Sequence, residues 1–149
     1  VEREGQKILG SLVGDRIEPM PIPVSATCTR VPVLDGHTEA VFVAAKRKAE
    51  IDEIKEAMAS FGKEFVELGL PSAPPRLIHV HDDEFRPQAR FDRELGGGMT
   101  TSVGRLRHDH VLPNGLKYGL LSHNTKMGAA KGAVLTAEYL VQAGYIAKP

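Results

Sequence analysis

Residues 28–43, CTRVPVLDGHTEAVFV, constrain the fold more than any other segment of this chain. Valines recur at every second position on both sides of Asp35-Gly36, and this alternation is typical of a strand with one buried face. An Asp-Gly pair is a strong signal for a tight turn or a β-bulge. The pattern therefore predicts two strands, over residues 25–33 and 38–45, that meet at Asp35-Gly36.

Two polar side chains, Arg30 and His37, flank this break. In a two-residue hairpin Leu34 would pair with His37, and a bulge would also invert the side-chain alternation once. Either arrangement turns Arg30 and His37 to the same side. A guanidinium binds a carboxylate through two hydrogen bonds, and an imidazole exchanges a proton near neutral pH. The pair indicates a small-molecule site; the alternative is a surface arginine and a turn histidine.

Helical and strand patterns follow one another along the rest of the chain. Apolar residues recur at helical spacing in residues 51–61, and Gly62 ends that pattern. The other expected elements are a helix over residues 1–12 that Gly14-Asp15 ends, strands over 76–81, 101–107 and 117–122, an ordered loop over 84–98, and a closing helix over 127–144. This order predicts a single α+β domain over residues 1–149, with a mostly antiparallel or mixed sheet and helices on one face.

The composition argues against several classes of partner. The 149 residues include 19 basic and 19 acidic side chains, whereas nucleic acids and anionic membranes select a basic face. No apolar run approaches the roughly 20 residues of a membrane span. Because Cys28 is the single cysteine, no internal disulfide is possible and a reducing cytoplasm is the default location. The chain starts inside a helical pattern, so we expect a fragment of a longer protein.

Histidine pairs and an arginine cluster are the remaining polar features. His79 and His81, like His108 and His110, could each present two imidazoles on one face of a strand. Metal sites need three or four ligands, so no metal site is expected. The arginines of residues 86–93 are expected to pair with nearby acidic residues close to a subunit contact; these acids are Asp83, Glu84, Asp92 and Glu94.

Five segments resemble, in the same order, aspartate-semialdehyde dehydrogenases of the archaeal and fungal branch. They are VEREGQKILG, SATCTRVPVLDGHTEAVFV, RPQARFDRELGGGM, TTSVGRLRHD and LSHNTKMGAAKGAVLTAEYL. The resemblance implies the fold of the C-terminal domain of the glyceraldehyde-3-phosphate dehydrogenase superfamily, which binds substrate and dimerises. It also implies an oxidoreductase that reduces aspartyl-β-phosphate to aspartate semialdehyde with NADPH, in lysine, threonine and methionine biosynthesis.

The same resemblance implies roles for five residues. Arg30 would bind the α-carboxylate of the aspartyl substrate, and His37 would be the acid/base that activates the nucleophilic thiol. Glu4 would meet the substrate amino group, and Lys7 would meet its phosphate. Asn124 would lie near the nicotinamide ring. Two cations and one carboxylate suit a zwitterionic acyl phosphate, which carries two anionic groups and one ammonium.

Two parts of such an enzyme are absent from this sequence. It contains no G-x-G-x-x-G turn, so NADP would be bound mainly by an N-terminal domain outside it. The nucleophilic cysteine of the family lies upstream, and Cys28 is expected to be a buried strand residue. By itself the chain is therefore expected to be inactive, and to act in a homodimer or homotetramer.

Other interpretations of the sequence stay open. A related acyl reductase, such as malonyl-CoA reductase, shares the archaeal-type scaffold, although Glu4 favours a substrate with an ammonium group. A dimerisation module without catalysis is the alternative from a different class. The closing helix departs from the family pattern at Met127, where arginine is usual, and at Lys131, where glycine is usual. These two departures concern the cofactor-side contacts of the helix.

Overall fold

The computed structural model describes residues 1–147 and divides into two compact units. The N-terminal unit is Val1–Pro32, and the larger second unit begins at Val33. Each unit has its own internal hydrogen bonding.

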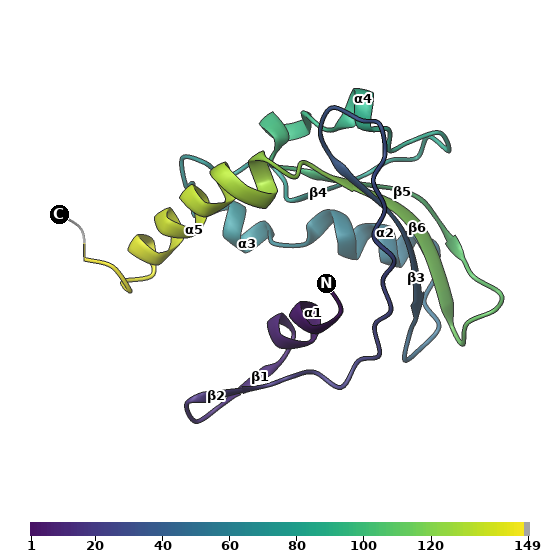
Figure 1. Ribbon diagram of the computed structural model, residues 1–149, viewed down its shortest axis with the longest axis horizontal. Helices are drawn as coiled ribbons and strands as arrows, with labels where there is room; N and C mark the ends of the chain where they lie inside the picture. The colour runs from purple at the N-terminus through teal and green to yellow at the C-terminus, as the bar shows by residue number, and fades with distance from the viewer. Residues whose placement is uncertain (148–149) are drawn as a thin grey trace. The chain divides into compact units, whose positions relative to one another are not determined.

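The N-terminal unit is a short helix followed by a hairpin. Helix α1 spans Glu2–Ile8, and strands β1 (Ser11–Val13) and β2 (Arg16–Glu18) pair antiparallel across Gly14-Asp15 (Figure 1). The helix predicted over residues 1–12 is therefore too long, because Gly14-Asp15 is the hairpin turn rather than a helix stop. Gly14 has φ +63°, a conformation that glycine adopts without strain.

An extended segment completes this unit and is hydrogen bonded to α1. Met20 N–H donates to the Gln6 carbonyl at 2.8 Å, and Ala26 N–H donates to Glu2 Oε1 at 2.7 Å. The strand predicted over residues 25–33 is wrong, since this segment pairs with no strand within residues 1–147. Pro23 and Pro32 bracket the segment and lack the N–H that a ladder needs.

A four-stranded mixed sheet forms the second unit (Figure 1). Its strand order is β3-β6-β5-β4, in which the β3–β6 and β6–β5 pairs are antiparallel and the β5–β4 pair is parallel. The strands are β3 (His37–Ala44), β4 (Ile78–Val80), β5 (Thr101–His108) and β6 (Gly115–Ser122). This topology confirms the mostly antiparallel, mixed sheet of an α+β fold.

Two main helices accompany the sheet. Helix α2 (Ile51–Ser60) contacts β4 and β5, as its apolar spacing predicts. Helix α5 (Lys131–Gln142) follows a π-helical turn, η2 (Lys126–Ala130), so the predicted closing helix is confirmed. Three short helices were not predicted, and two of them lie in the segment expected to be loop. They are α3 (Lys63–Val66), α4 (Ala89–Asp92) and η1 (Leu95–Gly98).

The core lies within the sheet and beside α5. Val103 and Leu121 are almost fully buried in neighbouring strands. A second cluster joins Leu70, Met99 and Leu135, the last of which is the buried residue of α5. Each such side chain stabilises the folded unit by roughly 1.5–3 kcal/mol when it leaves water.

Paired glycines let a loop lie on the sheet. Gly104 and Gly119 are opposite each other in β5 and β6. A Cβ atom on Gly104 would be 2.2 Å from the Arg86 carbonyl oxygen, and one on Gly119 would be 3.6 Å from Pro87 Cδ. A side chain at Gly104 would displace the 86–87 segment from the sheet surface, whereas a Cβ at Gly119 would make an ordinary contact with it.

Candidate functional site

His37 is the first residue of β3 and follows a tightly held corner. Gly36 is buried with φ +104°, and a Cβ there would be 2.9 Å from Leu121 Cδ1, so glycine is required for both shape and space. The Gly36 N–H donates to Asn124 Oδ1 at 2.8 Å. His37 then pairs with Ser122 across the β3–β6 ladder, and its side chain is exposed. The corner presents an imidazole to solvent on fixed backbone.

The turn that carries Asn124 is itself built around a buried histidine. His123 is 2% exposed, and its Nδ1 accepts the N–H groups of Thr125 and Lys126 at 3.3 Å each. Its Nε2 lies 3.4 Å from Glu94 Oε1, and Lys126 Nζ forms an ion pair with the same carboxylate. The Lys126 ammonium holds the pKa of Glu94 below its ordinary value. Sequence reasoning missed His123, although it directly precedes Asn124.

A second contact joins the same two segments. Thr125 Oγ1 donates to Asp35 Oδ1 at 3.4 Å, next to the Gly36–Asn124 hydrogen bond. Consecutive residues of one turn therefore bind consecutive residues of the other. The structure brings His37 and Asn124, both predicted site residues, to the two sides of one hydrogen-bonded corner.

The other three predicted site residues belong to the N-terminal unit. Glu4 and Lys7 are exposed on α1, and Glu4 Oε2 lies 3.3 Å from the Val1 amino group. Arg30 is exposed in the extended segment. No hairpin joins Arg30 to His37, so the strand geometry that was expected to turn both side chains to one face is wrong. Their common role stays a prediction.

Cys28 also departs from the sequence-based expectation. Its thiol belongs to an exposed residue in the extended segment, rather than to a buried strand. The predicted strand 25–33 was the reason for expecting burial, and that strand does not form. Activation of a thiol needs a nearby base or a helix N-terminus, and Cys28 lies at the start of no helix within residues 1–147.

A buried carboxylate organises the loop between β4 and β5. Asp92 is 2% exposed and accepts a 2.7 Å hydrogen bond from Arg86 Nε, a second from Arg86 Nη2, and one from Gln88 N–H at 2.7 Å. Burial by itself raises the pKa of Asp92, but the Arg86 and Gln88 hydrogen bonds outweigh it and hold this pKa below its ordinary value. The predicted pairing of the arginine cluster is thus confirmed for Arg86 and Asp92.

His81, the residue after β4, lies against this carboxylate. His81 Nε2 is 3.6 Å from Asp92 Oδ1, is buried, and has no hydrogen-bond partner among residues 1–147. The rings of His79 and His81 meet edge to face, 4.4 Å apart. Burial lowers the pKa of His81. Within the described residues, no group of three or more His, Cys, Asp or Glu side chains could hold a metal ion.

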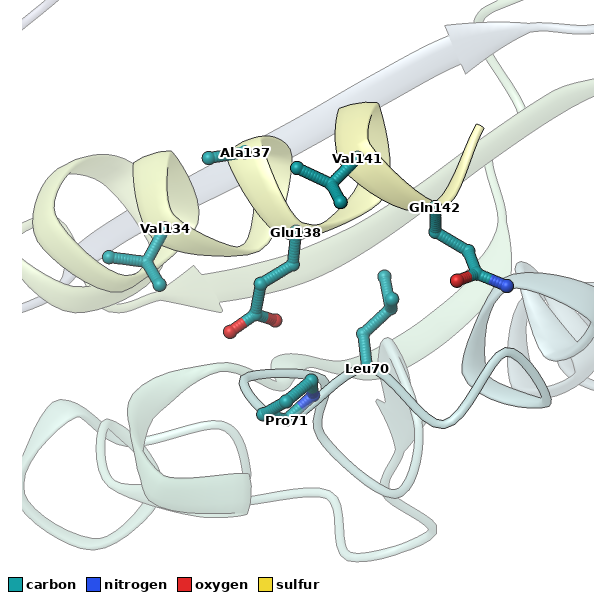
Figure 2. A pocket seen from close by; sticks show the side chains of 7 residues that line it. All are labelled: Leu70, Pro71, Val134, Ala137, Glu138, Val141 and Gln142. Carbon is teal, nitrogen blue, oxygen red and sulfur yellow. The ribbon is translucent and has the colours of Figure 1, made fainter. Parts of the chain in front are cut away.

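An apolar groove of about 430 Å³ separates α5 from the Leu70-Pro71 segment (Figure 2). Glu138 projects from α5 toward Leu70 and Pro71, and its carboxylate accepts the N–H and hydroxyl of Ser72 at 3.0 and 2.8 Å. These hydrogen bonds tie the helix to the loop at one side of the groove. Residues 1–147 contain no helix that qualifies as a membrane span by its length and hydropathy.

One face of the sheet is open near its β3 edge. Thr38, Ala40 and Phe42 alternate along β3 and are exposed, and Phe42 keeps 61% of its surface accessible. A shallow groove of about 180 Å³ runs along these residues and Gly119. An exposed strand edge with a large aromatic side chain is typical of an interaction surface.

The second unit is a four-stranded mixed sheet with a histidine at the start of its edge strand. The family model described as "Semialdehyde dehydrogenase, dimerisation domain" matches residues 2–127, and the chain belongs to this family. Among curated relatives, the aspartate-semialdehyde dehydrogenase of Methanothermobacter thermautotrophicus is 46% identical over 140 residues, and that of Aspergillus fumigatus is 44% identical over 154 residues.

These relatives are much longer than the chain. The alignments cover 94% and 98% of this chain but 40% and 42% of the relatives. Among solved structures, aspartate semialdehyde dehydrogenase with NADP from Candida albicans superposes on this chain with a TM-score of 0.84 and 40% sequence identity. The superposition covers 97% of this chain and 42% of the Candida albicans chain. For aspartate semialdehyde dehydrogenase II complexed with ASA from Vibrio cholerae, the superposition covers 78% of this chain and 30% of that enzyme, with 27% identity and a TM-score of 0.57. The chain spans about 40% of the length of the curated relatives.

Proposed function

We propose that this chain is the substrate-binding and dimerisation part of an NADP-dependent aspartate-semialdehyde dehydrogenase. The observation that carries the proposal is the match of 97% of the chain to the Candida albicans enzyme at a TM-score of 0.84. The proposed reaction is the reductive dephosphorylation of aspartyl-β-phosphate to aspartate semialdehyde. We place it in lysine, threonine and methionine biosynthesis in the cytoplasm.

The chemistry assigns each predicted residue a task. A thiolate supplied from outside this chain displaces phosphate, and NADPH, when bound, supplies the hydride that reduces the resulting thioester. His37 takes the proton of the thiol, because its imidazole is exposed on a fixed corner. Arg30 binds the substrate α-carboxylate, since a guanidinium pairs with it through two hydrogen bonds. Glu4 meets the ammonium, and Lys7 the phosphate.

Asn124 has a side chain that fits a nicotinamide. Its Oδ1 accepts the Gly36 N–H, so its amide NH₂ is the group left to donate. A carboxamide carbonyl is a suitable acceptor for such a donor. NADP is therefore a cofactor toward which this chain contributes Asn124, with most of the binding assigned to the rest of the enzyme.

We propose that homo-oligomers, either a homodimer or a homotetramer, form through the open sheet face. Phe42 stands on that face and is 61% exposed. Phe42→Glu should then convert dimers to monomers in sedimentation velocity at tens of micromolar. Phe61, 63% exposed at the end of α2, is the matched control, and Phe61→Glu should leave the association state unchanged. A dimer that survives Phe42→Glu contradicts this surface.

A chimera tests the activity directly. The part of the Methanothermobacter thermautotrophicus relative that this chain does not cover is joined to the N-terminus of this chain. With aspartate semialdehyde, phosphate and NADP, the chimera should form NADPH, and the chain alone should not. Malonyl-CoA with NADPH is assayed in parallel, and turnover of that substrate alone would favour the acyl-reductase alternative. A folded, oligomeric chimera without activity on either substrate would overturn the proposal.

A further inference from the structure

The corner before β3 contains a buried backbone donor that the sheet does not satisfy. Gly36 is buried, and the β3–β6 ladder begins one residue later, at His37. A buried N–H without an acceptor is costly, so its partner matters for the conformation of the corner. The acceptor is Asn124 Oδ1, 88 residues away in sequence, at 2.8 Å.

The turn that contains Asn124 is itself stabilised by hydrogen bonds and an ion pair. Nδ1 of the buried His123 accepts the N–H groups of Thr125 and Lys126. Glu94 Oε1 lies 3.4 Å from His123 Nε2, and the Glu94 carboxylate forms an ion pair with Lys126. Because the flanking residues are fixed, the Asn124 side chain starts from a constrained backbone. A side chain on rigid backbone loses less entropy when it makes its hydrogen bond.

We propose that Asn124 is a positioning residue, whose Oδ1 holds the Gly36 amide and thereby sets where His37 enters β3. The role of His37 as acid/base rests on the proposed function; the contact itself does not. The Thr125–Asp35 hydrogen bond, from the adjacent residues, acts in the same direction. Asn124 thus has two separable tasks: its oxygen serves the protein, and its NH₂ group serves the cofactor.

Substitutions separate these two tasks. Asn124→Leu keeps the size of the side chain and removes both the acceptor and the donor. Asn124→Asp keeps an acceptor for the Gly36 N–H and removes the donor. Asn114 supplies a matched control, because its Nδ2 donates to the Ala45 carbonyl at 3.2 Å, just beyond the opposite end of β3. Asn114→Asp removes that donor and leaves the His37 corner untouched.

Amide hydrogen exchange by NMR on the 149-residue chain is the deciding measurement. Asn124→Leu should speed exchange of the Gly36 amide roughly tenfold, the effect of losing one net hydrogen bond. Asn124→Asp and Asn114→Asp should leave it within about twofold, since both keep the acceptor. The Val103 amide reports folding. If Asn124→Leu speeds exchange of that amide too, Asn124→Ala takes its place in the comparison. The variants without an acceptor are Asn124→Leu and Asn124→Ala, and unchanged Gly36 exchange in a folded one of them overturns the proposal.

The chimera adds a second readout. Asn124→Leu should lower kcat for the semialdehyde with little change in its KM, and Asn124→Asp should recover most of kcat while raising KM for NADP. Equal losses of kcat in the two variants would contradict a role through Oδ1. If the wild-type chimera is inactive, the proposed function fails, and the exchange result still decides whether Asn124 holds the corner.

Discussion

His37 and Arg30 are seven residues apart in sequence, and both side chains are exposed, yet their backbones are held very differently. His37 is the first residue of an eight-residue strand. The residue before it, Gly36, packs on Leu121 and hydrogen bonds to Asn124. Arg30 lies in an extended segment of the N-terminal unit that forms no strand within residues 1–147. Exposure of a side chain therefore says little about how firmly its backbone is positioned.

The difference suits the two proposed tasks. Proton transfer depends on geometry to within a fraction of an ångström, so an acid/base benefits from a rigid strand start. A guanidinium on a long side chain can adapt to a carboxylate, so its backbone needs less support. The following predictions test whether rigidity and function divide in this way, beginning with the largest expected effect.

Loss of the imidazole should be the most damaging change. In the chimera, His37→Asn should lower kcat by about 10² to 10⁴ with a modest change in KM, as expected for removal of a general acid/base. The pH–rate profile should flatten at the same time. Steady-state kinetics across pH measures both effects. A kcat within about threefold of wild type would assign His37 a structural role at the corner instead.

Removal of the buried carboxylate tests the rigidity of the second unit. Asp92→Asn leaves the Arg86 guanidinium without its charged partner and should lower the free energy of unfolding by about 3 kcal/mol. Asp82→Asn is the control, because Asp82 pairs with Lys55 at an exposed position and its loss should change stability little. Urea unfolding measures both variants. Equal stabilities would show that the Asp92 cluster does not organise the loop.

Arg30→Ala should affect binding rather than turnover. In the chimera we expect KM for aspartate semialdehyde to rise roughly 30-fold or more, since the substrate carboxylate loses its charged partner. Because the segment around Arg30 forms no part of the sheet, urea unfolding should change little. Kinetics and unfolding together measure this split. An unchanged KM would remove Arg30 from the site.

The pH dependence of stability should show a smaller contribution from His81. Burial lowers the pKa of His81, and the carboxylates of Asp92 and Asp83 oppose this, while His79 and Arg86 add to it. An unfolded histidine has a pKa near ~6.5, so below that pH the unfolded chain binds more protons than the folded one. The free energy of unfolding should therefore fall as the pH drops through this range.

His81→Gln should flatten that dependence. Urea midpoints measured from pH 7 to pH 5 would show the change, with His110→Gln, at an exposed position, as the control. The lowered pKa of Asp92 acts in the same direction at lower pH: its contribution to stability is present above the unfolded pKa and is lost as the pH falls through the folded value. An identical slope in wild type and His81→Gln would contradict the assignment.

Local patterns in the sequence were sufficient to predict a helix or strand where the apolar residues of a segment keep one regular spacing. The apolar spacing of residues 51–61 predicted α2, and alternating or β-branched runs predicted β3, β5 and β6 to within about two residues. Segment resemblance identified the family, because its motifs occur in order along nearly the whole chain. Periodicity reports which face of a segment is apolar, so it succeeds for long, regular elements.

Pairing and burial were decided by tertiary structure. The alternation around Asp35-Gly36 predicted two strands joined by a hairpin turn or a bulge. The first of these strands does not form, β3 pairs with β6, about 80 residues later in sequence, and the short hairpin lies at Gly14-Asp15 instead. His123 and Asp92 look like ordinary polar residues in the sequence, and their burial depends on partners that only folding brings to them. These partners are backbone N–H groups for His123 and the Arg86 guanidinium for Asp92. Strand partners and buried hydrogen bonds are set by contacts between distant segments, which a local pattern does not contain.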